Sequence, residues 1–393
     1  MNDLPRVLFF TSEIPQSVNA GSMQLYRVLQ GYPGEKLMVM GWPPEKDAKL
    51  LPCRYETVKL LTYRMACTRF RHWMSGLNAL NTLWEPQLGR SEKMAREFQP
   101  EVVVTVMDKL SHYKHAWAVA RRLGIPLMTI TMDDPEIFET AHPMLNWAQK
   151  RLLQKIYSYA SLSLGVSREM AEYLEREFQK KTEVFYFGPP EGIRPRPAKE
   201  SGSLKKTGQF VLAHAGAMSL GYREGIGEIL PALEKADAVL NVYTKDQHIV
   251  PQHPRIRNRG FHPVEKLWPL VQSECDGVIL PYSFGKKDER VYRTHFPTKL
   301  SEYCWLGMPV IVAGPEYATG VRWAQRHPDA CVAISDVRSE TMGPRLRRLA
   351  EEGVVRERLA LQAVEVAQRE FDPVAIREQF VKFLEKAAAS GKN

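Results

Sequence analysis

The chain has 393 residues, more than a single hydrophobic core usually supports, so two domains are expected. A hydrophobic content of 44% with 25% charged residues excludes a disordered chain, and no apolar run reaches the roughly 18 residues of a membrane-spanning helix. The net charge of +9 favours an anionic partner: a nucleotide, a lipid surface or a nucleic acid. The 5 cysteines are scattered without metal-ligand spacing, which predicts a reducing, cytoplasmic location.

The first half of the sequence alternates strand-like and helix-like segments. Its strands are predicted at 6–11, 38–40, 101–107, 124–131, 161–166 and 183–187. Its helices are predicted at 23–30, 115–123 and 156–160, and a further helix that ends at 178 is predicted after Ser167, its N-cap. Strand, loop and helix in this order are typical of a parallel α/β sheet. Gly21 lies in the first such loop, where the backbone is expected to approach a bound group closely.

Polar residues follow two of these strands. Asp133 and Asp134 come after the fourth strand, and Asp108 and His112 come after the third. Ligands of open α/β sheets bind at the carboxyl ends of strands, so Asp133 or Asp134 is a candidate general base, with Asp108 and His112 as further candidates. The alternative for the paired aspartates is a turn before Pro135, where Asp is favoured for local hydrogen bonding. For His112 the favoured interpretation is an ordinary polar residue.

The segment 59–76 interleaves lysine and arginine with leucine and aromatic residues. A basic helix of this kind can lie on an anionic membrane surface or meet an anionic acceptor. The alternative, which the pattern favours, is a helix with a solvated basic face and its aromatic side chains in the core. A peripheral contact with the inner face of the membrane is therefore an open prediction.

A polar, proline-rich stretch separates the two halves, which predicts a domain at 1–192, a linker at 193–208 and a second domain at 209–371. The second domain repeats the first pattern. Its strands are predicted at 210–215, 238–243, 256–261, 276–282, 309–313 and 331–335. Its helices are predicted at 229–233, 264–273, 342–351 and 354–369, the last two with their arginines on outer faces, and a final helix is predicted at 375–388.

A helix is predicted to begin at Pro297, because the φ of proline is already helical. Phe296 then occupies the cap position without an acceptor side chain, so the amides of residues 298–300 point outward and form an anion site. Lys299 adds a positive charge, and Glu302 lies on the same face, where it could hold a vicinal diol. A phosphate group and a ribose are the expected ligands of this site. The alternative, which these residues alone leave equally open, is an ordinary helix start.

A glycine-bearing loop is predicted at 216–227, after the first strand of the second domain. Its glycines lack the dinucleotide-binding spacing. Arg223 within the loop is nevertheless well placed to contact a phosphate.

Four segments carry a family resemblance. Residues 296–312 read Phe-Pro-Thr-Lys-Leu-Ser-Glu-Tyr-Cys-Trp-Leu-Gly-Met-Pro-Val-Ile-Val. This segment resembles the donor-nucleotide segment of the GT4 family of glycosyltransferases, Pro-Ser/Thr-Lys-x-x-Glu-Tyr-x-x-x-Gly-x-Pro-Val. Residues 160–174 resemble the segment that closes the N-terminal domain of that family, 215–216 the opening of its C-terminal domain, and 276–282 the strand before its donor segment.

The resemblance implies the GT-B fold: an α/β chain of two Rossmann-like domains that face each other across a cleft, with residues 372–393 crossing back as a C-terminal helix onto the N-terminal domain. A nucleotide-sugar donor would bind in the cleft, and Gly21 and Asp108 would lie on the acceptor side. The implied donor-binding residues are Gly216, Arg223, Lys245, Thr294, His295, Thr298, Lys299, Leu300 and Glu302.

Two positions depart from the family pattern. Thr294 replaces a glutamate that contacts the donor sugar, and Ala217 replaces an arginine, whose charge Arg223, Lys245 or Lys286 could supply. The sequence has no Asp-x-Asp pair, so no metal and no cofactor is expected. Cationic side chains and the helix dipole would neutralise the diphosphate instead.

The favoured function is a hexosyl-type glycosyltransferase that moves a sugar from a nucleotide-sugar to an acceptor hydroxyl of a glycan or a lipid-linked saccharide, as in polysaccharide biosynthesis. The resemblance favours retention over inversion. One alternative is a nucleotide-sugar epimerase or hydrolase of the same fold. The other is a non-catalytic anion-binding protein, for which nucleic acid is disfavoured because the arginines spread over both halves.

Overall fold

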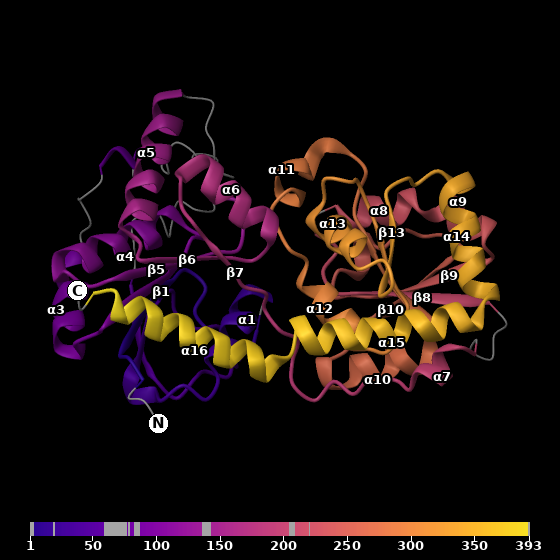
Figure 1. The fold of residues 1–393 in the computed structure, drawn as a ribbon, viewed down its shortest axis with the longest axis horizontal. Helices are drawn as coiled ribbons and strands as arrows, with labels where there is room; N and C mark the ends of the chain where they lie inside the picture. The colour runs from indigo at the N-terminus through magenta and orange to yellow at the C-terminus, as the bar shows by residue number, and fades with distance from the viewer. Residues whose placement is uncertain are drawn as a thin grey trace. The chain divides into compact units, whose positions relative to one another are not determined.

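The computed structural model describes residues 4–18, 20–58, 77, 79–81, 87–135, 143–203, 209–219 and 221–391. The chain forms two compact units: Met1–Phe187 with Val374–Asn393, here the N-terminal unit, and Gly188–Pro373, here the C-terminal unit. Each unit combines one sheet with helices (Figure 1). The basic segment at 59–76 lies outside the described residues, so the basic helix there stays a prediction.

The N-terminal unit is built on a 7-stranded sheet of order β3-β2-β1-β4-β5-β6-β7, in which neighbouring strands are parallel. Its strands are β1 (Val7–Thr11), β2 (Leu37–Gly41), β3 (Arg54–Thr57), β4 (Val102–Val106), β5 (Leu127–Thr131), β6 (Leu162–Gly165) and β7 (Glu183–Val184). The central strands are buried along their whole length, which is why they read in the sequence as uninterrupted apolar runs.

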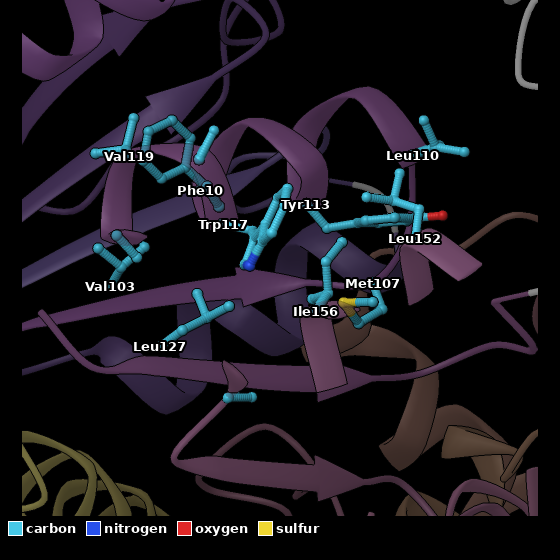
Figure 2. Packing of buried hydrophobic residues seen from close by; sticks show 14 of the residues in the cluster. Phe10, Val103, Met107, Leu110, Tyr113, Trp117, Val119, Leu127, Leu152 and Ile156 are labelled. Carbon is cyan, nitrogen blue, oxygen red and sulfur yellow. The ribbon is translucent and has the colours of Figure 1, made fainter. Parts of the chain in front are cut away.

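The helices of the N-terminal unit are α1 (Ala20–Leu29), α3 (Leu88–Phe98), α4 (Leu110–Leu123), α5 (Pro143–Tyr159), α6 (Arg168–Phe178) and α16 (Pro373–Ala389), with a short 3-10 helix at Gly34–Lys36. Trp117 of α4 points toward Val103 and Leu127 of the sheet in the hydrophobic core (Figure 2). The C-terminal helix α16 belongs to this unit: Phe380 lies 5.5 Å from Phe185 between ring centroids.

The C-terminal unit has a 6-stranded parallel sheet of order β10-β9-β8-β11-β12-β13. Its strands are β8 (Phe210–Ala215), β9 (Ala238–Tyr243), β10 (Ile256–Gly260), β11 (Gly277–Pro281), β12 (Val310–Ala313) and β13 (Cys331–Ile334). Its helices are α7 (Ala198–Ser201), α8 (Tyr222–Glu228), α9 (Leu230–Lys235), α10 (Val264–Glu274), α11 (Glu289–Tyr292), α12 (Thr298–Cys304), α13 (Thr319–Arg326), α14 (Ser339–Glu351) and α15 (Gly353–Glu370), with 3-10 turns at Gln247–Ile249 and Lys286–Asp288.

Two predicted boundaries are wrong for physical reasons. The helix expected from 115 begins at Leu110, because the polar and aromatic residues 111–115 are buried in the core instead of forming a loop. The glycine-bearing stretch at 216–227 is not all loop, because it contains most of α8. Gly225 lies in that helix where a β carbon would overlap the carbonyl oxygen of Pro281, so close packing requires the glycine.

One arginine predicted on an outer face is buried. Arg356 of α15 is 3% exposed, and its guanidinium donates to the carbonyl oxygens of Leu349 at 2.6 Å and Ala350 at 2.7 Å, at the end of α14. It also donates to the carbonyl of Ser201 at 3.0 Å and to that of Gly202. A guanidinium can be buried when its N–H groups meet this many acceptors, and here it joins α14, α15 and the segment before β8.

Candidate functional site

The helix α12 begins one residue later than predicted. Pro297 is its N-cap, with φ −74° and ψ 111°, so the assignment of Phe296 to the cap is wrong: the extended ψ of Pro297 places it outside the helix. The amide of Leu300 donates to the carbonyl of Pro297 at 2.9 Å and is not free for a ligand. In the described part of the chain, the amides of Thr298 and Lys299 remain without a backbone partner at this helix start.

The side chain of Lys299 lies across the loop that follows β8. Its Nζ is 4.2 Å from the ring centroid of Tyr222 and 3.4 Å from the carbonyl oxygen of Ala217. Gly216 has φ +121°, and a β carbon there would overlap the Lys299 side chain. The sequence-predicted residues Gly216 and Lys299 therefore meet at the carboxyl end of the sheet, where ligands of open α/β sheets bind.

Burial lowers the pKa of Lys299 to about 8, while the carboxylates of Glu302 and Asp246 act in the opposite direction. Both carboxylates therefore lie near enough to the ammonium group to favour its charge. The amide of Met218 donates to Asp246 at 3.1 Å, which ties the loop after β9 to the loop after β8. Sequence reasoning missed Asp246, although its place just after a strand of the same sheet was a usable signal.

Tyr303 fixes α12 to the end of β8. Its hydroxyl accepts from the amide of Ala215 at 2.9 Å and donates to the carbonyl of the same residue at 3.2 Å. Tyr303 comes four residues after Lys299, so both side chains lie on the face of α12 that meets β8. This spacing was a signal in the sequence that the functional interpretation did not use.

The variant Tyr303→Phe is expected to lower the free energy of unfolding by about 1–3 kcal/mol, because it leaves the buried amide of Ala215 without its acceptor. Chemical denaturation followed by fluorescence measures this loss. A matched control is Tyr317→Phe, a residue whose side chain is less buried. Equal stability of the Tyr303→Phe variant and the wild type would contradict the assigned role.

His214 and Tyr222 form a buried layer beneath Lys299. Their ring centroids are 5.3 Å apart, and Nδ1 of His214 donates to the carbonyl of Ile279 at 3.2 Å. Burial lowers the pKa of His214 to about 3, so this imidazole is neutral at physiological pH. Neither residue was singled out from the sequence, because both read as ordinary members of a strand and of a glycine-rich loop.

The remaining predicted cations of this unit lie at the same end of the sheet. Arg223 is exposed in the first turn of α8, next to Tyr222. Lys245 follows β9, with its Nζ 4.7 Å from the ring centroid of the exposed Phe261. Lys286 lies in the 3-10 turn after β11. The roles of these three cations in binding a donor stay predictions.

Thr294 and His295 directly precede α12. Thr294 is 5% exposed, so the side chain that replaces the family glutamate is buried. The amides of both residues donate to the carbonyl of Val291, at 3.2 and 2.9 Å, and the hydroxyl of Thr319 donates to the carbonyl of His295. Both residues thus take part in fixing the backbone that leads into the helix.

In the N-terminal unit, Asp108 is held by the turn after β1. Its carboxylate accepts from the amide of Ser12 at 3.1 Å, from the hydroxyl of the same residue and from the amide of Lys109 at 2.6 Å. Burial raises the pKa of Asp108, while these hydrogen bonds act in the opposite direction. The geometry gives this carboxylate a structural role at the end of β4.

Glu13 was not singled out from the sequence, although it follows the first strand. Burial raises its pKa, and the neighbouring charges of Asp108 and Asp133 act in the same direction. A β carbon on Gly21, in the first turn of α1, would lie 3.4 Å from Oε2 of Glu13. Gly21, Asp108 and Asp133 are therefore grouped around Glu13 at the carboxyl end of this sheet.

The two adjacent aspartates after β5 differ in environment. Asp134 is 4% exposed, and its carboxylate accepts from the hydroxyl of Tyr173 in α6 at 3.1 Å. Asp133 is exposed. Of the two, Asp133 is the carboxylate that a solvent-borne hydroxyl can reach.

His112 is fully buried in the first turn of α4. Its Nδ1 lies 3.3 Å from the hydroxyl of Ser111, and its ring meets the edge of Trp42 at 5.6 Å between centroids. Burial lowers the pKa of His112 to about 3, so the imidazole is neutral. In this structure the side chain has no exposed surface through which to contact an acceptor.

Within the described ranges, none of the helices combines the length and apolar character needed to cross a membrane.

Comparison with known proteins finds similarity in structure and none in sequence. No protein-family model matches the chain, and no curated protein is significantly similar to it in sequence. The structure of HepE from Anabaena, in complex with UDP and glucose, superposes with a TM-score of 0.65 at 16% identity, over 97% of this chain and 99% of that one. Sucrose-phosphate synthase from Thermosynechococcus elongatus gives a TM-score of 0.67 at 14% identity, over 99% of this chain and 100% of that one.

Trehalose 6-phosphate synthase from Burkholderia multivorans gives a TM-score of 0.63 at 14% identity, over 99% of this chain and 98% of that one. Likeness at such low identity shows the fold and leaves the activity to be argued from the site. The likeness extends over nearly the whole chain, and both units carry a parallel sheet with helices. The chain has the GT-B fold.

Proposed function

We propose that the chain is a glycosyltransferase that takes a hexosyl group from a nucleotide-sugar. The observation that carries the proposal is the meeting of Lys299 with the loop at Gly216, beside the open amides at the start of α12. A lysine, two backbone amides and a helix start at the carboxyl end of a parallel sheet together form an anion site that suits a diphosphate. The complexes of HepE with UDP and with UDP-glucose support a nucleotide-sugar as the donor.

The C-terminal unit would bind the donor. The amides of Thr298 and Lys299 and the ammonium group of Lys299 would hold the diphosphate, and Glu302 would accept hydrogen bonds from the ribose hydroxyls. Arg223, exposed beside Tyr222, would supply a second charge. Charge develops on the diphosphate as it leaves, so groups fixed around it lower the barrier to transfer.

The N-terminal unit would bind the acceptor, a saccharide or a lipid-linked saccharide. Asp133 is the best candidate to interact with an acceptor hydroxyl, because its side chain is exposed whereas that of Asp134 is buried. An inverting reaction would need Asp133 as a general base. The resemblance of the donor segment supports a retaining reaction, in which no such base is required. The basic segment at 59–76 is a further candidate for contact with a membrane-bound acceptor.

Nucleotide binding is expected to be independent of divalent metal, because Lys299 and the helix start would neutralise the diphosphate. Titration of the protein with UDP in the presence of EDTA should give the same dissociation constant as titration with Mg²⁺. Loss of binding in EDTA that Mg²⁺ or Mn²⁺ restores would contradict this part of the proposal.

Nucleotide affinity is also expected to depend on pH. The pKa of about 8 leaves Lys299 of the free protein mostly protonated at pH 7 and mostly neutral at pH 9, and the protonated form attracts phosphate. The association constant should therefore fall about tenfold from pH 7 to pH 9. Lys299→Arg is the matched control, because arginine stays charged over this range and should bind with little pH dependence. The same fall in both proteins would contradict the assignment.

Transfer itself is tested by incubating the protein with nucleotide-sugars and candidate saccharide acceptors and measuring the released nucleoside diphosphate. Release that requires both an acceptor and Lys299 supports the proposal. Release without an acceptor, or formation of an epimeric sugar nucleotide, would identify a hydrolase or an epimerase of the same fold instead.

A further inference from the structure

The start of α12 has no local cap, since Pro297 offers no side-chain acceptor. Its direction is set instead by α13, which lies against the residues that lead into it. The hydroxyl of Thr319 donates to the carbonyl of His295, and a β carbon on Gly320 would come within 3.1 Å of Cγ of Pro297. The approach of the chain to the helix is therefore held by tertiary contacts and not by the helix itself.

Phe371 touches both sides of the α12 segment. Its ring, fully buried, lies 6.0 Å from that of Phe296 and 5.5 Å from that of Trp323, between centroids. Its carbonyl accepts from the indole nitrogen of Trp305, the C-cap of α12, at 3.2 Å. Phe371 lies two residues before Pro373, where the chain leaves the C-terminal unit.

Glu370 fixes the orientation of Trp323. Its carboxylate accepts from the indole nitrogen of Trp323 at 3.1 Å and pairs with Nε2 of His327 at 2.9 Å. The imidazole of His327 stacks on Trp323 at 4.2 Å between centroids. Trp323 in turn packs edge-to-face against Phe296, at 6.2 Å. A continuous set of buried rings thus runs from the exit of the unit to the residue that precedes Pro297.

We infer that Trp323 and Phe371 are positioning residues that orient the start of α12. The last residues of the C-terminal unit before Pro373 would in this way determine the geometry of the diphosphate site. The inference rests on the proposed function. Close packing allows little independent movement of neighbouring rings, so a change at Phe371 displaces Phe296 and with it the amides and the lysine that follow. Such small displacements of binding groups are costly, because charge-assisted hydrogen bonds need good geometry.

The test is a double-mutant cycle between Phe371→Leu and Lys299→Met, with UDP and pyrophosphate as probes in titration calorimetry. Phe371→Leu is expected to weaken the binding of both probes about tenfold in the wild-type background. In the Lys299→Met background its effect should be clearly smaller, less than about threefold, since the ammonium group is absent and only the backbone amides remain to be positioned. Phe210→Leu is the matched control: it truncates an equally buried ring in the main core of the same unit and should leave affinity unchanged.

A milder variant covers the case in which Phe371→Leu does not fold. Trp305→Phe removes the hydrogen bond to the carbonyl of Phe371 and keeps an aromatic ring, and it should also weaken both probes. Affinities of Phe371→Leu or Trp305→Phe equal to that of Phe210→Leu, or additive effects in the cycle, would overturn the inference while the proposed function stands. A wild-type protein that binds none of UDP, GDP, ADP and TDP would overturn the proposed function itself.

Discussion

Lys299→Met is expected to weaken the binding of nucleoside diphosphates by about 100-fold while it raises the melting temperature of the free protein. The loss of affinity follows from the removal of a charge-assisted hydrogen bond to phosphate at a half-buried side chain, worth about 2–3 kcal/mol. Calorimetric titration with UDP measures this effect. An unchanged dissociation constant would contradict the assignment of Lys299 to the diphosphate.

The gain in stability has a different origin. The pKa of Lys299 falls from its ordinary 10.5 to about 8 on folding, so the unfolded chain binds more protons between these pH values and the charge opposes folding at neutral pH. Methionine fills similar space without that cost, and thermal unfolding should show a rise of a few degrees. Lys266→Met, which removes an exposed positive charge from α10, is the control and should change neither affinity nor stability. A melting temperature lower than that of the wild type would contradict a cost to folding from the partly buried ammonium group.

Arg356→Met is expected to be among the most destabilising single changes in the C-terminal unit, at about 3–4 kcal/mol. The guanidinium donates to four carbonyl oxygens, those of Ser201, Gly202, Leu349 and Ala350. Methionine leaves these acceptors without their donor in a region that water reaches poorly. The resulting loss of folding free energy is larger than the net contribution of the hydrogen bonds to stability, because unpaired buried carbonyl groups are not resolvated.

Urea denaturation of Arg356→Met measures the loss. The control is Arg358→Met, two residues further along α15, where the side chain is exposed and the change should stay within about 0.5 kcal/mol. Similar midpoints for the two variants would show that the buried guanidinium does not join α14, α15 and the segment before β8 as described.

Much of the fold could be predicted because its central strands are buried on both faces. The run at 101–107 favours a strand covered on both faces, since residues 102–106 are all β-branched, and the mostly apolar run at 210–215 is likewise a buried strand. The exposed edge strand β3 was missed for the opposite reason, because Arg54–Thr57 carries charges on a half-open face. Gly307 follows α12 with a φ of +64°, and its close packing against the backbone of Arg196 depends on a segment far away in the sequence.

The candidate site was partly predictable for similar reasons. Lys299 and Gly216 could be named because a helix start and a loop after a strand are local features. Their contact with Tyr222, and the hydrogen bonds of Tyr303 to Ala215, join segments far apart in the sequence. The charge pattern gave one wrong prediction: Arg356 was expected on the exposed face of its helix but is buried. The carbonyl groups that accept from its guanidinium come together only in the folded chain, so the sequence does not reveal them.

The central claim is that the start of α12 binds the diphosphate of a nucleotide. Calorimetric titration of the wild type and of Lys299→Met with UDP, GDP, ADP and TDP tests it most directly. At least one of the four is expected to bind the wild type, with an affinity that falls about 100-fold in the variant. Binding of none of them to the wild type, or equal binding to both proteins, would contradict it.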